Sequence, residues 1–243
     1  MNRDIKPYLK KIELDCNGCN PDEYPFNIPA IRGLKSLKFH PDVTFLVGEN
    51  GAGKSTLIEA IALAMGFGAE GGTKNVQLNT ADTASLLYKH LKTVKGYKKP
   101  GDFYFLRAES FYNVATYMDK TGYLAGYGGK SLHERSHGEA FLSTLTMKLR
   151  GKGFYLFDEP EAALSPNRQM SALAAIHQLV LKESQFIIAT HSPILLAYPR
   201  SSILLMDENG IEKVRYEDTE HYSVTKQFLN NYPKMLEILM GEE

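Results

Sequence analysis

Short runs in which nearly every position is apolar predict the strands of a buried sheet. They are found at Val43–Val47, Phe103–Leu106, Phe154–Phe157 and Phe186–Thr190. Strands without polar alternation are typical of a parallel sheet that is covered on both faces. Segments of helical character lie between these runs, at Leu57–Ala64 and Pro166–Lys182. The chain is therefore expected to form an α/β fold with a mostly parallel sheet flanked by helices.

Other segments predict further strands and helices outside this sheet. Two opening strands are expected at Tyr8–Leu14 and Ile31–Phe39, with a loop rich in Asn, Gly, Asp and Pro between them. Asn209-Gly210 separates two strand-like runs and favours a two-residue hairpin of Ile203–Glu208 with Ile211–Tyr216. Apolar spacing predicts further helices at Ala81–Lys95, Ser131–Leu149 and Pro193–Tyr198.

Two more segments differ from this regular pattern. Gly66–Thr73 holds four glycines and is expected to be mobile, because glycine disfavours a helix. The C-terminal tail is helical in its spacing but interrupted at Pro233, and its apolar positions are Val224, Phe228, Leu229, Tyr232, Leu236 and Leu239. Such a stripe predicts a cap that docks on the domain rather than a free arm.

Composition limits the class of protein without naming a partner. The chain has 243 residues and 43% hydrophobic content, which suits one large domain. Lys and Arg together number 28, as do Asp and Glu, so the net charge does not indicate nucleic acid or an acidic membrane. The longest apolar stretches are too short to span a bilayer, and the N-terminus is charged from Arg3 onward. We expect a cytoplasmic protein without a membrane segment.

A phosphate-binding loop is the strongest motif in the chain. Gly48-Glu49-Asn50-Gly51-Ala52-Gly53-Lys54-Ser55-Thr56 matches the pattern G-x-x-x-x-G-K-[ST] and lies between a predicted strand and a predicted helix. The glycines allow backbone N–H groups to face a phosphate, and the helix N-terminus adds electrostatic attraction. Lys54 would reach the β- and γ-phosphates, and the Ser55 hydroxyl would bind Mg²⁺. The motif predicts binding of a nucleoside triphosphate with magnesium.

Acidic residues and a histidine follow two of the predicted strands. Asp158 and Glu159 come directly after Phe154–Phe157, and His191 follows Phe186–Thr190. In a parallel sheet these positions emerge at the same edge as Lys54. We interpret Asp158 as a metal ligand, Glu159 as the general base for the attacking water, and His191 as a contact to the γ-phosphate or to that water. A simpler role for His191 is to cap the next helix.

The motifs in this order resemble the ABC-type ATPase core. They are the phosphate loop, Ser136-His137-Gly138-Glu139, Phe157-Asp158-Glu159-Pro160-Glu161, Ala163-Leu164-Ser165-Pro166 and Thr190-His191-Ser192. More narrowly, the chain is similar to bacterial predicted AAA ATPases grouped near RecF, SMC and OLD ATPases. The resemblance extends from Tyr8 to about Tyr216. It implies a P-loop NTPase with an added antiparallel β subdomain and an inserted helical signature subdomain.

The resemblance also implies how two copies would cooperate. In that superfamily two cores dimerise head to tail with ATP between them, and the signature of one copy meets the γ-phosphate on the other. Here the signature is Ser136, His137, Gly138 and Glu139, with Ser136 and Gly138 supplying hydroxyl and backbone N–H groups at a helix start. Ser136 and Glu139 also fit a Ser-x-x-Glu capping box, and the two roles are compatible.

Several positions depart from the family pattern. One glycine and the glutamine of the ABC-transporter signature are replaced by His137 and Glu139, which argues against a transporter subunit. Ser165 stands where the superfamily has an aspartate, and either Arg107 or Glu109 occupies the place of its glutamine after the strand at Phe103–Leu106. Arg32 or Lys35 is the candidate for a basic nucleotide contact before the phosphate loop, with a solvated surface charge as the alternative. The sequence offers no dependable aromatic to stack on adenine, although Tyr24 and Phe26 are available.

The resemblance suggests a single ATPase domain in four parts. They are the strands and phosphate-loop core at 1–75, a helical signature subdomain at about 76–150, the Asp158 and His191 core at 151–216 and a helical tail at 217–243. Only about eighty residues separate Thr56 from Ser136 and none shows sustained heptads, so the coiled-coil arms of SMC-type proteins are not expected.

The expected function is an ATP-driven switch that dimerises around ATP and acts on a partner protein or on DNA. The alternatives are a non-catalytic ATP-binding signalling module or the soluble ATPase subunit of a transporter. Lys89–Lys99 is the concentrated basic stretch that could contact DNA, although a solvated face is the simpler interpretation. Cys16 and Cys19 lack a second cysteine pair for a zinc site and are interpreted as reduced thiols in a loop.

Overall fold

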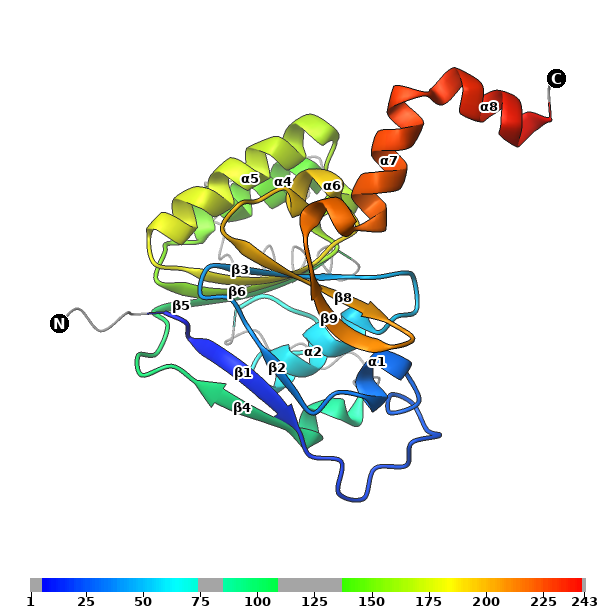
Figure 1. Cartoon of the computed structure of the whole chain (residues 1–243). Coiled ribbons are helices and arrows are strands. Elements are labelled where there is room, and N and C mark those ends of the chain that lie inside the picture. The colour runs from blue at the N-terminus through cyan, green and yellow to red at the C-terminus, as the bar shows by residue number, and fades with distance from the viewer. Residues whose placement is uncertain (1–5, 74–84, 109–136, 242–243) are drawn as a thin grey trace.

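The computed structural model describes residues 6–73, 85–108 and 137–241 (Figure 1). Its centre is a large sheet of order β5-β6-β7-β3-β8-β9. The strands are β3 Val43–Val47, β5 Asp102–Arg107, β6 Gly153–Asp158, β7 Gln185–Ala189, β8 Ser201–Asp207 and β9 Gly210–Val214. The pairs from β5 to β8 are parallel, and only β8 and β9 are antiparallel. The predicted α/β class with a mostly parallel sheet is confirmed.

Helices cover both faces of this sheet. One face carries α4 His137–Ser143, continued by the π-helical turn Thr144–Lys148, with α5 Pro166–Leu181 and α6 Pro193–Leu196. The other face carries α2 Lys54–Ala64, which also contacts the small sheet. Every residue of β3, β6 and β7 is buried. Their uniform hydrophobicity is thus explained by two separate apolar cores, one on each face.

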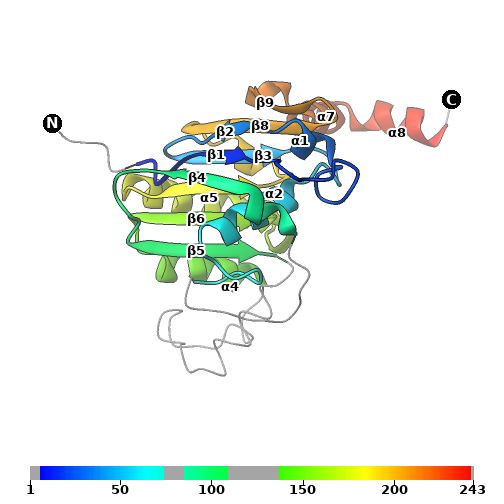
Figure 2. The same cartoon turned by 90° about the horizontal axis from the view of Figure 1, so that it is seen from below.

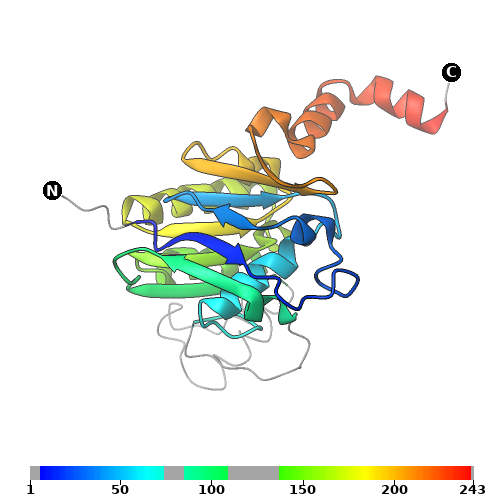
Figure 3. The same ribbon diagram turned by 60° about the horizontal axis from the view of Figure 1, so that its bottom comes forward.

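A three-stranded antiparallel sheet of order β2-β1-β4 forms a second layer (Figure 3). Its strands are β1 Leu9–Leu14, β2 Ser36–Lys38 and β4 Leu91–Lys95. Ile12 and Leu37 face the core of α2, whereas Lys10 and Lys92 are exposed. This alternation of buried and exposed residues is typical of a sheet with one face exposed to solvent. This layer corresponds to the expected antiparallel β subdomain.

Two local predictions were wrong around the small sheet. Ile31–Phe39 is not one strand, because α1 Pro29–Arg32 precedes β2. Pro29 stands at the first helical turn, where its fixed φ favours a helix, and Gly33 follows directly. Ala81–Lys95 is not one helix either, since the 3-10 turn Leu86–His90 leads into β4, which pairs with β1. That pairing overrides the local helical spacing.

The glycine-rich run Gly66–Thr73 is bonded to β5 at Gly72. The N–H of Gly72 donates to the Phe105 carbonyl over 2.7 Å, and the N–H of Phe105 donates back to the Gly72 carbonyl over 2.9 Å. A Cβ on Gly71 would lie 2.7 Å from the Phe105 oxygen, and its φ is +91°. Here glycine permits a close approach to β5, and the expected mobility of the segment stays a prediction.

The chain ends in two helices that extend away from the domain (Figures 1 and 2). They are α7 Glu220–Asn230 and α8 Tyr232–Met240, preceded by the 3-10 turn Tyr216–Asp218. No residue of either helix is buried by the rest of the described chain. The predicted docked cap is therefore wrong, because the apolar stripe has no facing surface in this fold. Among the described residues, no helix has the length and apolar content to cross a membrane.

Candidate nucleotide-binding site

The phosphate loop joins the buried end of β3 to the start of α2. Gly48 has a φ of +149°, and a Cβ there would lie 2.2 Å from the Met206 carbonyl oxygen. Gly53 has a φ of +93° and precedes α2 directly. Both conformations need glycine. No side chain of the described residues caps the N-terminus of α2, so its backbone N–H groups remain available for an anion.

Lys54 is a buried cation inside this loop. The residue is 4% exposed, and its Nζ donates to the carbonyl oxygens of Gly48 and Glu49 over 2.9 and 2.8 Å. Desolvation lowers the pKa of Lys54, while the carboxylates of Glu159 and Asp158 oppose that shift. Phosphate oxygens would be stronger acceptors than carbonyls because the hydrogen bond would join opposite charges. The carbonyl oxygens that now accept from Lys54 are thus weaker acceptors than the phosphate oxygens that would replace them.

Ser55 and Asp158 provide paired oxygen ligands beside Lys54. The Ser55 hydroxyl donates to Asp158 Oδ1 over 3.0 Å, and Asp158 is 6% exposed. A hydroxyl and a carboxylate are hard oxygen donors of the kind that Mg²⁺ takes together with waters and phosphate oxygens. Within the described residues no group of three or more His, Cys, Asp or Glu side chains could hold a metal by itself. The donor set fits a magnesium ion that arrives with a nucleotide.

Arg107 lies at the same edge, at the end of β5. Its NH1 donates to Glu59 Oε2 of α2 over 2.6 Å, and its Nε lies 3.8 Å from Asp158 Oδ2. Of the two sequence candidates for the position of the glutamine, Arg107 is therefore the one placed beside Asp158. Glu109 lies outside the described residues.

Glu159 has an unusual backbone conformation. Its φ and ψ are +50° and +52°, which is the left-handed region that a glutamate rarely adopts. The Glu159 N–H donates to the Ala189 carbonyl at the end of β7 over 2.9 Å. The side chain is 45% exposed, and Oε1 lies 3.8 Å from His191 Nε2. Backbone strain of this kind is often found at functional sites, where it fixes the direction of a side chain.

His191 is held through its backbone N–H and through Nδ1. Its backbone N–H donates to the Glu161 carboxylate, which also accepts from the Thr190 hydroxyl over 2.7 Å. Nδ1 of His191 is 2.9 Å from Nε2 of His221. Nε2 of His191 is buried and has no hydrogen-bond partner in the described part of the chain. Burial, and then the charge of Lys54, lowers the pKa of His191. The residue does not cap α6, since the Ser192 side chain does so.

The remaining sequence candidates have other bonding partners or lie outside the described residues. Arg32 bonds the Pro21 carbonyl over 2.8 Å and Asp22 over 3.2 Å, so it belongs to the preceding loop. Ser136 lies outside the described residues. His137 begins α4, and a Cβ on Gly138 would lie 2.8 Å from the Ala163 carbonyl oxygen. Glu139 pairs with Arg168 over 3.2 Å. Gly138 and Glu139 thus pack on the segment after β6.

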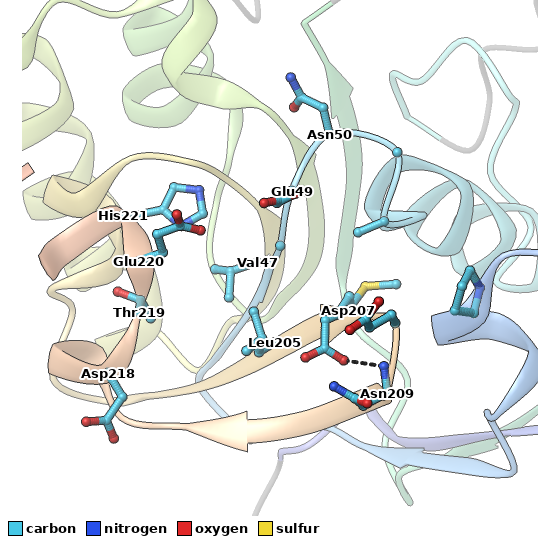
Figure 4. A pocket seen from close by; sticks show the side chains of 16 residues that line it. Val47, Glu49, Asn50, Leu205, Asp207, Asn209, Asp218, Thr219, Glu220 and His221 are labelled. Carbon is cyan, nitrogen blue, oxygen red and sulfur yellow. Dashed lines mark hydrogen bonds between the residues drawn. The ribbon is translucent and has the colours of Figure 1, made fainter. Parts of the chain in front are cut away.

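A cavity of about 620 Å³ opens beside the first half of the phosphate loop. Figure 4 shows Glu49 and Asn50 on one side, Asp207 and Asn209 of the β8–β9 turn on another, and His221 on α7. Sequence reasoning did not find His221, because nothing in the spacing of the tail relates it to His191. It also gave no role to Glu161, although this residue belongs to the motif that was identified.

The two aromatic residues that precede the phosphate loop, Tyr24 and Phe26, lie in different surroundings. Phe26 is 9% exposed and packs edge-on against His90. Tyr24 is 63% exposed, and its hydroxyl lies 3.1 Å from Thr56 Oγ1. Tyr24 is therefore the aromatic placed at the phosphate loop, and Phe26 belongs to the core.

The two cysteines are free thiols. Cys19 Sγ lies 3.4 Å from His90 Nδ1. Burial, and then the neighbouring Cys16, raises the pKa of Cys19 to about 11. This thiol is thus protonated near neutral pH, and it has little of the thiolate character that reactive cysteines need.

Comparison with known proteins gives a family match and a fold. The model of the AAA domain matches residues 26–110, which include the phosphate loop. A search of curated proteins gave no match. Among solved structures the chain is similar to cbiO1 from Clostridium perfringens, part of the ABC transporter complex cbiONQ. The identity is 17% over 97% of this chain and 100% of that chain, with a TM-score of 0.50.

Two further structures are similar. A bacterial Atm1-family ABC exporter with ATP bound is 15% identical over 90% of this chain and 42% of that chain, with a TM-score of 0.51. The SMC head domain from Thermotoga maritima is 16% identical over 86% of this chain and 99% of that chain, with a TM-score of 0.46. The two ABC matches, with TM-scores of 0.50 and 0.51, show a common fold, and identities of 15–17% do not transfer activity or partners.

Proposed function

We propose that this chain, an ABC/SMC-like AAA ATPase in its family match and its fold, binds ATP with Mg²⁺ and hydrolyses it. One observation carries the proposal: the ends of β3, β6 and β7 bring Lys54, Asp158 and His191 to one edge of the sheet. A site for binding alone would need the phosphate loop. It would not need a partly exposed carboxylate and a histidine beside it.

The side chains divide the work of in-line attack on the γ-phosphate. Lys54 and the N-terminus of α2 attract the phosphate oxygens and stabilise the charge that develops on them. Glu159 accepts a hydrogen bond from the attacking water and takes its proton as the new bond to the γ-phosphorus forms and the bond to the β,γ-bridging oxygen breaks, which releases ADP. Nε2 of His191 is on the side of Glu159, and it contacts a γ-phosphate oxygen. Ser55 and Asp158 would hold the Mg²⁺, which neutralises charge on the β- and γ-phosphate oxygens when bound.

A second copy of the chain completes the site in this proposal. Glu49, Asn50 and Gly51 are exposed, so the loop has a face that another chain can cover. By the family resemblance the covering segment is the signature around Ser136, with His137, Gly138 and Glu139. ATP would thereby drive head-to-tail dimerisation, and hydrolysis would reopen the dimer. Arg32 and Tyr24 remain candidates for contacts to the nucleotide.

The test is Glu159→Gln, which keeps the shape of the side chain and removes its basicity. We expect turnover to fall by about 10²- to 10⁴-fold. The variant should bind Mg·ATP and elute as a dimer, measured by light scattering with and without the nucleotide. Glu212→Gln is the matched control, since Glu212 is exposed on β9, which does not carry Lys54, Asp158, Glu159 or His191.

Two outcomes would count against parts of the proposal. Wild-type turnover no faster than the protein-free background removes hydrolysis and leaves a binding module, whereas equal turnover in wild type and Glu159→Gln removes Glu159 as the base. A Glu159→Gln variant that stays monomeric with ATP bound removes the self-assembled dimer. Coupling to a transporter would instead require a membrane partner that stimulates turnover.

A DNA partner is the second candidate, and the β4–β5 turn favours it. Lys95, Lys98 and Lys99 are exposed there beside Tyr97, which is 81% exposed. Clustered lysines around an accessible aromatic suit a nucleic-acid backbone with a stacked base. Replacing the three lysines by glutamine should reduce the slope of log affinity against log salt by up to about 3. An unchanged slope removes this surface as a DNA contact, without bearing on hydrolysis.

A further inference from the structure

His221 stands beside the histidine at the strand end although the two are 30 positions apart. Its Nε2 lies 2.9 Å from Nδ1 of His191, and the ring centroids are 5.0 Å apart with an interplanar angle of 51°. The opposite nitrogen of His191, Nε2, points to the side of Glu159 and lacks a hydrogen-bond partner among the described residues. A buried imidazole nitrogen of this kind normally finds a partner.

The proton in the His191–His221 bond determines what His191 can do. Burial lowers the pKa of both residues, so the pair is neutral near neutral pH. If His191 donates from Nδ1, its Nε2 is a bare lone pair that repels a phosphate oxygen. If His221 donates from Nε2, then Nε2 of His191 carries the hydrogen and can donate to that oxygen. The partner of one ring nitrogen thus fixes the role of the other.

His221 is anchored although most of its helix is exposed. Thr219 is 1% exposed and caps α7, with its Oγ1 accepting from the Tyr222 N–H. The Tyr216 hydroxyl donates to the Pro193 carbonyl over 2.8 Å, next to the loop that holds His191. The first turn of α7 therefore rests on the loop after β7, and only the rest of α7 and α8 extends outward.

We propose that His221 is a positioning residue, which donates Nε2–H to His191 and so presents the N–H of His191 to the γ-phosphate. Because His221 lies in the first turn of α7, this bond also joins the two C-terminal helices to the triphosphate end of the site. The inference rests on the proposed function, and it adds a residue from outside the strand ends to the set that acts there.

The first experiment reads the tautomer directly and needs no turnover. Long-range ¹H–¹⁵N spectra of the side-chain imidazoles distinguish protonated from bare ring nitrogens. Assignment uses His191→Gln and His221→Gln as references. In the wild-type protein with a non-hydrolysable ATP analogue and Mg²⁺, His191 should carry its hydrogen on Nε2. Finding it on Nδ1 would overturn the proposal even in a protein that hydrolyses ATP, and the spectrum remains readable if hydrolysis fails.

The second experiment compares variants of His221 in turnover. His221→Leu removes the donor, and we expect kcat to fall by about 10- to 100-fold with KM within about 3-fold, as for other residues that orient a ligand. His221→Gln keeps a donor at a similar position and should restore most of kcat. Gln227→Leu, on the exposed part of α7, is the matched control. Equal kcat in His221→Leu and wild type would overturn the role, whereas equal losses in the Leu and Gln variants would point to packing and also overturn it.

Discussion

The strand ends of the large sheet and the C-terminal helices contain similar apolar residues in opposite surroundings. Phe157 on β6 is fully buried between Phe141 and Phe186. Leu229 on α7 and Leu239 on α8 are 66% and 71% exposed. The edge of the sheet is thus fixed by packing on both faces, and the helices are fixed at one end only. Chemistry that depends on distances of a few tenths of an ångström belongs at the edge, and the helices reach it through their first turn.

The largest expected difference is in folding stability. Phe157→Ala should reduce the free energy of unfolding by about 3–5 kcal/mol, because it leaves a cavity inside a packed core. Leu229→Ala should change it by no more than about 0.5 kcal/mol. Urea unfolding followed by circular dichroism measures both. A cost above about 2 kcal/mol for Leu229→Ala would show that α7 packs on the domain in solution and would break the comparison.

The second difference separates binding from stability at the edge itself. Lys54→Met should weaken Mg·ATP binding by at least about 100-fold, since the phosphate oxygens lose their buried cation. The nucleotide-free variant should be as stable as wild type, or more stable by up to about 1 kcal/mol, because a desolvated charge is removed. Calorimetric titration and urea unfolding measure the two quantities.

Lys234→Met on α8 is the matched control for Lys54→Met, since Lys234 is exposed. It should leave both ATP affinity and stability unchanged. Loss of stability in Lys54→Met without nucleotide would mean that its bonds to the Gly48 and Glu49 carbonyls hold the loop together.

The sequence predicted the regions that local pattern and strand order determine. Val43–Val47 and Phe186–Thr190 are nearly the observed β3 and β7, because strands buried on both faces must be apolar throughout. From the parallel order it followed that Lys54, Asp158 and His191 would emerge at one edge, and the structure brings these residues to that edge. The roles assigned to them stay predictions.

Long-range contacts explain what the sequence could not predict. Leu91–Lys95 is a strand because it pairs with β1, about eighty positions earlier, and no local pattern records that pairing. The apolar stripe of the tail correctly indicated helices but not what they would face. His221 belongs to the site only because the turn before α7 rests on the loop after β7. Such a placement depends on the whole fold.

A smaller effect tests the anchoring of α7. Thr219→Ala removes the capping oxygen, which should cost about 1 kcal/mol and be confined to the helix. Amide hydrogen exchange in the first turn of α7 should accelerate by about 5-fold, with the amides of β6 unchanged. Ser223→Ala, at an exposed position of the same helix, is the control and should leave exchange unchanged. Acceleration that spreads to β6 would mean that α7 supports the sheet.

The smallest effect is the pH dependence of stability, which tests whether His221 belongs with the edge. Burial lowers the folded-state pKa of His191 and His221 below the ordinary value of 6.5, against the charges of Glu159 and Glu220. Between the lowered and the ordinary pKa the unfolded chain binds more protons, so the free energy of unfolding falls as pH falls below about 6.5. Glu161 changes the stability in the opposite direction. Burial raises its pKa above 4.5, so the free energy of unfolding falls as pH rises and Glu161 ionises.

His221→Gln should therefore lose less stability than wild type between about pH 7.5 and about pH 5.5 in urea unfolding, where the histidines titrate. An equal loss in both proteins would show that His221 is solvated in solution and that the first turn of α7 belongs with the exposed helices.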